Sequence, residues 1–112
     1  MDKIEKYRNI VCDILREYAT IKKTLTPDVK FQTLIDKEND HYILLSIGWF
    51  KQRFIYTTAF HFDIIEGKVW LQQNNTDVMI ADELEERGIP KSDIVLGFQP
   101  PHVRSHLGFA VA

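Results

Sequence analysis

Alternating apolar and polar residues dominate the middle of the chain. Three runs rich in β-branched and aromatic residues, 41–50, 54–65 and 68–73, are separated only by short turns. A fourth alternating run occupies residues 29–36. A period of two residues is typical of half-buried strands, and consecutive strands with short links pair antiparallel. The pattern therefore predicts a four-stranded antiparallel meander.

The same alternation predicts which side chains share a face of this sheet. One face of the second strand carries Ile43, Leu45, Ile47 and Trp49. One face of the third strand carries Phe54, Tyr56, Thr58, Phe60, Phe62 and Ile64. The helices predicted below are too few to cover every apolar face, and an exposed apolar face marks an interaction surface. We therefore expect self-association or a protein partner on the uncovered face.

A long amphipathic helix is predicted over residues 2–23. Asp2 is the expected N-cap, with Glu5 at the third helical position, and Pro27 follows the end of the helix. Apolar residues recur every three or four positions, which gives one stripe that packs on the sheet. The stripe comprises Ile4, Tyr7, Val11, Ile14, Leu15, Tyr18 and Ile21.

A shorter helix is predicted before residue 88. Thr76 or Asp77 is the expected N-cap, and Gly88 fits a left-handed position at the C-terminal end, with Pro90 beyond it. The outer face of this helix is acidic, with Asp82, Glu83, Glu85 and Glu86. We expect that face to be solvated, and the alternative is a docking surface for a basic partner.

The C-terminal segment is predicted to be extended. Residues 94–98 form a short buried strand or an extended segment, and Pro100 and Pro101 enforce an extended backbone after it. The apolar last residues are expected to dock on the rest of the chain. The predicted fold class is α+β: a two-layer sandwich with an N-terminal helix, a four-stranded antiparallel meander, a second helix and an extended C-terminal tail. We expect a single domain over residues 1–112.

Composition narrows the function classes. The 112 residues carry 14 Lys and Arg against 16 Asp and Glu, a net charge of −2. Duplex DNA binding relies on a basic surplus, so direct binding of nucleic acid is doubtful. Cys12 is the one cysteine, the first residues lack the apolar core of a signal peptide, and no apolar run is long enough for a membrane helix. We expect a cytoplasmic protein without a membrane association.

Candidate chemistry is sparse. His61 and Asp63 lie two residues apart on a strand and share a face, as an acid–base or metal pair would. Such a site needs further groups, and the candidates are Asp36, Asp40, His41 and Glu66. His102 and His106 are four apart, but the flanking prolines and Gly108 leave room for one helical turn at most. We expect no catalytic residue, no metal and no cofactor, and read His61 and Asp63 as a polar spot on the sheet.

Aromatic residues and the tail are the stronger candidates for an interaction surface. Trp49 and Trp70 are typical of core or interface anchors. A base-stacking platform would need interleaved basic residues, and only Lys51, Arg53 and Lys68 lie near them. The tail offers a second distinctive surface, formed by Pro100, Pro101 and Arg104.

Several ordered strings resemble one known family. They are KIEKYRNIVCDILREYA near the start, the Gly48–Trp49 pair, HFDIIEGKVWLQ over residues 61–72, IADELEERGIPKSDIVLGFQPPHVR over residues 80–104, and the ending GFAVA. Together these strings are similar to the XisI family, and the resemblance spans nearly the whole chain. That family is described as controlling factors for excision of the fdxN DNA element in cyanobacteria.

The resemblance implies a regulatory role beside a site-specific recombinase, and a companion of the nuclease-like XisH family. It assigns no catalytic residue, cofactor or metal. We therefore expect a non-enzymatic accessory protein that acts through protein partners and forms a homodimer, using the uncovered sheet face or the first helix. One alternative is a direct DNA-binding accessory factor of the excisionase kind. The other is a small enzyme using His61 and Asp63, which would place both side chains in a concave pocket.

Overall fold

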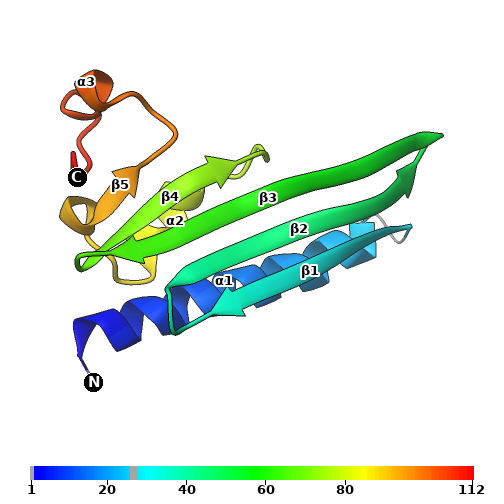
Figure 1. The fold of residues 1–112 in the computed structure, drawn as a ribbon, viewed down its shortest axis with the longest axis horizontal. Coiled ribbons are helices and arrows are strands. Elements are labelled where there is room, and N and C mark those ends of the chain that lie inside the picture. Colours follow the sequence, from blue (N-terminus) through cyan, green and yellow to red (C-terminus); the bar gives the residue numbers. More distant parts are fainter. Residues whose placement is uncertain (1, 26–27) are drawn as a thin grey trace.

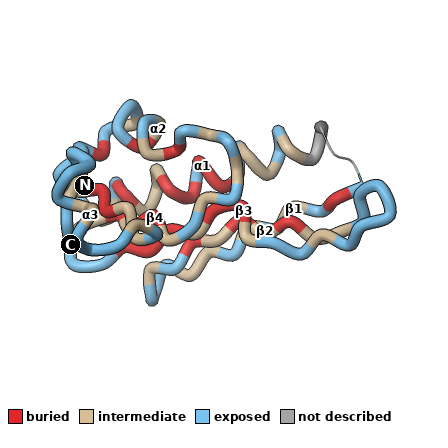
Figure 2. The backbone as a smooth tube through the Cα atoms, turned by 90° about the horizontal axis from the view of Figure 1, so that it is seen from above, coloured by how far each residue is buried: buried red, intermediate tan, exposed pale blue. Residues whose placement is uncertain are grey.

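The computed structural model describes residues 2–25 and 28–112, so the predicted helix break at Pro27 lies outside the described residues. A long helix, α1 (Lys3–Leu25), and a short one, α2 (Ile80–Glu86), lie on one side of an open five-stranded sheet (Figure 1). Figure 2 shows the buried residues concentrated between the helices and the strands. Neither of these two helices covers the other side of the sheet, and the predicted α+β fold class is confirmed.

The strands follow one another across the sheet in chain order. They are β1 (Val29–Asp36), β2 (His41–Phe50), β3 (Arg53–Ile65), β4 (Lys68–Asn74) and β5 (Ile94–Leu96). The first four pair antiparallel, as the short links predict. β5 pairs parallel with β4, because the chain crosses over through α2 before it returns to the sheet. The predicted short buried segment is therefore a fifth strand.

The predicted extended tail is wrong in one respect. After β5 the chain forms a one-turn helix, α3 (Pro101–Arg104), with Pro101 in its first turn. Proline is well tolerated there, because its fixed φ suits the helix and its missing N–H has no partner in the first turn. Ala110 then donates backbone hydrogen bonds to the carbonyls of Lys91 and Ile94, at 3.2 and 2.9 Å. The chain end is docked beside β5, as predicted.

The predicted single apolar face of β3 is also wrong. Leu44 pairs with Phe60 and Leu45 pairs with Thr58, so Ala59 is an extra residue that forms a bulge. The bulge shifts the alternation by one position. Phe60, Phe62 and Ile64 therefore face the helices and are buried, whereas Phe54 and Tyr56 are on the opposite face and exposed.

The core lies between α1, α2 and the sheet. It contains Tyr7, Val11, Ile14 and Leu15 of α1, Tyr42 and Leu44 of β2, Phe60, Phe62 and Ile64 of β3, Val69 and Leu71 of β4, and Ile80 and Leu84 of α2. Cys12 is buried among them. Ile21, the last member of the predicted stripe, is exposed. No helix among the described residues is long and apolar enough to cross a membrane.

The helix ends follow the predicted capping chemistry in two places of three. Asp2 Oδ1 accepts the backbone N–H of Glu5 at 2.8 Å. At the end of α2, Gly88 has φ +112°, and Ile89 donates to the carbonyl of Leu84 at 3.0 Å, which is a Schellman motif. The predicted start of α2 at Thr76 or Asp77 is wrong, because the Thr76 hydroxyl accepts the N–H of Val78 and forms a separate turn before the helix.

Candidate functional site

The face of the sheet opposite the helices, called the open face here, is the candidate site. The strand register sets its rows. Asp36 is opposite His41, His41 is opposite Asp63, and Asp63 is opposite Trp70, so these four residues form one row across four strands. Directly opposed residues share a face of the sheet. The row lies at the end of the open face near the β1–β2 turn, which is its polar end, and the apolar end of this face lies near the β2–β3 turn.

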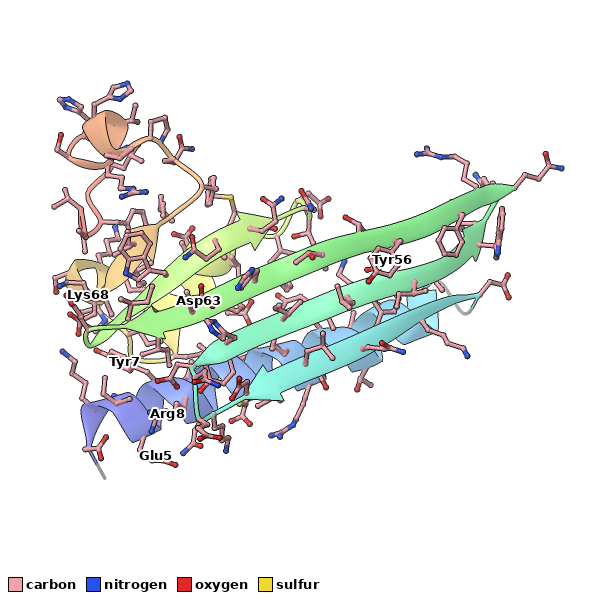
Figure 3. The ribbon with its side chains drawn as sticks, viewed as in Figure 1. Glu5, Tyr7, Arg8, Tyr56, Asp63 and Lys68 are labelled. Atoms are coloured by element: carbon pink, nitrogen blue, oxygen red, sulfur yellow. The ribbon has the colours of Figure 1, made fainter. Side chains whose placement is uncertain are left out.

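The apolar end carries large exposed side chains. Trp49 is opposite Phe54, and Tyr56 is opposite Ile47. The rings of Trp49 and Phe54 lie 5.3 Å apart, and Trp49, Phe54 and Tyr56 are 61%, 55% and 66% exposed. Figure 3 shows Tyr56 on the face of β3 turned toward the viewer. The prediction that apolar sheet surface stays uncovered is confirmed. The pairing of β2 with β3 next to their turn brings these rings together, and the bulge at Ala59 separates them from the buried face of Phe60 and Phe62.

The polar end contains a side-chain cluster, which the sequence indicated only in part. His61 and Asp63 do share a face, and His61 Nε2 lies 2.9 Å from Asp63 Oδ1. His41 joins them from β2, with Nδ1 2.7 Å from the same oxygen. Gln72 Nε2 donates to Asp63 Oδ2 at 3.2 Å. His41 was one of four candidate additions, and only the strand register distinguishes it from the others.

The three carboxylates proposed beside His41 do not join this cluster. Asp36 accepts hydrogen bonds from the amide of Asn39 and from the backbone N–H groups of Glu38 and Asn39. Asp40 accepts two hydrogen bonds from Arg8, at 2.7 and 3.1 Å. Glu66 lies at the β3–β4 turn with positive φ. Each therefore supports a turn or a packing contact at the margin of the open face.

Hydrogen bonding controls the charge of the cluster. Burial opposes ionisation of Asp63, but the hydrogen bonds from His41, His61 and Gln72 outweigh it and hold the pKa of that carboxyl below its usual value. The hydrogen bond to Asp63 and its negative charge raise the pKa of His41. An ionised carboxylate only accepts hydrogen bonds, so both imidazoles direct a donor at Asp63.

The tail lies against the same face beyond Trp70. The guanidinium of Arg104 lies 5.0 Å from the Trp70 ring centre, and it donates to the carbonyls of Gly97, Gln99 and Val111, at 3.3, 3.1 and 3.3 Å. Arg104 therefore fixes the tail on half-buried Trp70. Pro100 and Pro101 are exposed and begin α3, and both His102 and His106 are exposed beyond them.

The acidic outer face of α2 is only partly solvated. Glu83 accepts a hydrogen bond from Tyr18 at 2.6 Å and pairs with Arg87 at 2.7 Å. Arg87 also pairs with Glu17 of α1. Glu83 therefore ties α2 to α1, while Asp82, Glu85 and Glu86 remain exposed.

An apolar hollow lies on the helix side of the sheet. Its volume is about 240 Å³, and its lining includes Val29, Phe31, Phe50, Ile55 and Ala59. Neither His61 nor Asp63 lines it. The two side chains lie instead on the open surface of the sheet, where a substrate would have protein on one side only.

The fold and this face define a class of protein: a small α+β protein whose two helices cover one side of a curved sheet and whose other side offers exposed aromatic rings. The family described as XisI protein matches residues 1–111. The chain belongs to the XisI family.

Two solved structures resemble the chain closely. A XisI-like protein from Anabaena variabilis ATCC 29413 is 41% identical, with a TM-score of 0.89, and the match covers 97% of this chain and 99% of that one. The fdxN element excision controlling factor XisI from the same organism is 32% identical, with a TM-score of 0.84, over 99% and 100% of the two chains. None of the curated proteins matches this chain.

Proposed function

We propose that this chain is a non-enzymatic regulatory protein that controls site-specific excision of a DNA element through contacts with other proteins. The observation that carries the proposal is the exposed aromatic group at the apolar end of the open face. Aromatic side chains supply much of the energy of protein interfaces. The process follows from the 32% identical relative, which is an fdxN element excision controlling factor. A cyanobacterial source and a cytoplasmic location fit these relatives and the free, buried Cys12.

A protein partner fits this surface better than DNA does. Duplex DNA is bound through arrays of Lys and Arg that neutralise phosphates. The net charge is −2, and three of the carboxylates counted in it lie on the exposed part of α2. The alternative of a direct DNA-binding factor has weaker support, because the basic residues of α1 alternate with Glu5, Asp13 and Glu17 and the short helix α2 is acidic. The alternative of an enzyme using His61 and Asp63 is dropped, because the pair lies on an open sheet face.

We propose a XisH-like companion as the partner, with the recombinase machinery engaged indirectly. The test is co-purification of this chain with the companion encoded beside it. We expect a stable complex at micromolar concentration, and loss of it in the double variant Trp49→Ser, Tyr56→Ser. Met79→Ser is the matched control, since Met79 is a large exposed apolar residue just before α2. The proposal fails if the wild-type protein forms no complex with the companion. It also fails if Met79→Ser abolishes the complex and the double variant does not.

A homodimer through the open face is part of the proposal, and it forms where no companion occupies that face. α1 is the weaker candidate interface, because its apolar stripe is already buried against the sheet. The open face brings together exposed apolar side chains from three strands, Leu34, Trp49, Phe54, Tyr56 and Ile65. Two copies related by a twofold axis would bury the same rings twice.

A further inference from the structure

We propose that His41, His61 and Asp63 form a binding site for a divalent transition-metal ion on the open face. The proposal does not depend on the excision-control function. The described residues contain this one group of three or more His, Cys, Asp or Glu side chains whose donor atoms converge.

The strand register builds the group from two strands. His41 is the first residue of β2 and is directly opposite Asp63 of β3. His61 is two positions before Asp63 on the same strand, so it faces the same way. The bulge at Ala59 decides that this face is the open one rather than the core. All three donors are therefore held by paired backbone and not by a loop, which keeps their spacing fixed.

The donor set matches a known class of metal chemistry. Two imidazole nitrogens and one carboxylate oxygen suit borderline ions such as Zn²⁺, Co²⁺ and Fe²⁺. Ions of this kind bind donors about 2.1 Å away, so neighbouring donors are about 3 Å apart in an octahedral site and about 3.4 Å apart in a tetrahedral one. Asp63 Oδ1 lies 2.7 Å from His41 Nδ1 and 2.9 Å from His61 Nε2, and all three donor atoms lie within 4.8 Å of one another. An ion can replace the two hydrogen bonds when His41 carries its proton on Nε2 and His61 carries its proton on Nδ1, with protons in excess of one per ring released to solvent. The three donor atoms would then move slightly apart around the ion.

The surroundings support a cation at this place. Asp63 is buried, with 8% of its surface exposed. Gln72 donates a hydrogen bond to Oδ2 of Asp63, so Oδ1 remains directed at the two imidazoles. Such outer hydrogen bonds orient metal ligands in known sites. Asp36 is opposite His41 in the next strand and adds negative charge on the same side. Figure 3 shows Asp63 on the side of the sheet turned toward the viewer.

The site would leave coordination positions open toward solvent. Three protein ligands from one face of a sheet occupy one side of the ion. The remaining positions point away from the sheet, where water or a side chain of a docked protein can complete the shell. The His102–His106 pair lacks a third ligand of this kind and serves as an internal comparison.

The test is a metal titration of the full chain. Protein freed of metal with EDTA is titrated with Co²⁺ at about pH 8, where free imidazole is neutral. We expect one ion per chain, visible d–d absorption, and displacement by Zn²⁺. His41→Ala and His61→Ala should each weaken binding at least tenfold, roughly the loss expected for a disturbed metal site. His102→Ala is the matched control and should bind as the wild type does.

Two outcomes overturn the proposal. One is wild-type protein that binds neither Co²⁺ nor Zn²⁺ more tightly than a millimolar dissociation constant. The other is binding that both His41→Ala and His61→Ala retain. Far-UV circular dichroism checks the fold of each variant. If a variant does not fold, imidazole NMR of the wild type decides: Zn²⁺ must shift the resonances of His41 and His61 and leave those of His102 and His106 in place.

Discussion

At the scale of single residues, acidic side chains hold the helices against the sheet. Asp93 accepts the hydroxyl hydrogen bond of Tyr7 and pairs with Lys3 at 3.1 Å, which fastens the start of α1 to the segment before β5. Asp40 accepts two hydrogen bonds from Arg8 and one from Tyr42, at 2.7 Å, which fastens the next turn of α1 to the β1–β2 turn. These contacts join segments far apart in the chain.

Asp93 should make stability depend on acid pH. Burial opposes its ionisation, but the bonds from Tyr7 and Lys3 outweigh burial and lower the pKa of Asp93. A carboxyl with a lowered folded-state pKa stabilises the fold above its unfolded pKa, near 3.9, and loses that contribution as pH falls through the folded value. Asp93→Asn should therefore reduce the free energy of unfolding more at pH 7 than at pH 3. Urea unfolding at both pH values measures this, and an equal loss at both would contradict it.

The Arg8–Asp40 pair should contribute measurably to stability. The guanidinium makes two hydrogen bonds to one carboxylate, and both side chains are partly buried. A bidentate bond between charged groups that is partly shielded from solvent stabilises more than a fully exposed ion pair does. We expect Arg8→Ala to lower the free energy of unfolding in urea. Arg16→Ala is the matched control on an exposed part of α1 and should change it by less than about 0.5 kcal/mol.

At the scale of elements, close packing of β1 on β2 depends on Gly48. Gly48 is opposite Val29, the first residue of β1, and a Cβ there would lie 2.6 Å from the carbonyl oxygen of Asp28 and 2.9 Å from Val29 Cα. Its φ of +154° also disfavours other residues. The glycine therefore lets the two strands approach at the start of their pairing.

Gly48→Ala should destabilise the protein by about 1–3 kcal/mol, because both the backbone contact and the φ angle oppose a side chain. Thermal or urea unfolding measures the loss. Gly108→Ala is the matched control: Gly108 also has positive φ, but no atom lies within 4 Å of the added Cβ. A loss at Gly48 no larger than the loss at Gly108 would show that the contact with Asp28 does not matter.

Local capping and turn signals were readable from sequence, whereas bulges were not. Asp2 and Gly88 act through bonds to residues within five positions, so their spacing along the chain predicts them. The Ala59 bulge depends on how β3 pairs with β2, which local spacing does not contain. A second shift, between His61 and Phe62, occurs where β3 pairs with β4.

At the scale of the whole molecule, the helices cover one side of the sheet and leave aromatic rings on the other. Substitution of these rings should change the free energy of unfolding of a single chain only slightly. Each of them, Trp49, Phe54 and Tyr56, is already more than half exposed. Their burial can contribute mainly where a second surface covers them. Stability and assembly are therefore separable at this face.

The double variant Trp49→Ser, Tyr56→Ser should abolish self-association without unfolding the chain. We expect wild-type protein to have twice the mass of one chain by light scattering, and the double variant to have the mass of one chain. Its circular dichroism spectrum should be unchanged, because neither ring belongs to the core. If the wild-type protein has the mass of one chain, the homodimer proposal is wrong. If the double variant is still a dimer, the interface lies away from the open face.

The sequence by itself determined the four antiparallel strands, the two main helices, two of their three predicted caps and the family resemblance, since period, turn chemistry and ordered strings are local properties. Tertiary structure alone decided the parallel fifth strand, the face on which Phe54 and Tyr56 lie, and the meeting of His41 with His61 and Asp63. Strand register sets each of these features. Residues 20 or more positions apart are brought opposite one another only when the strands pair, and one bulged residue moves every side chain after it to the other face.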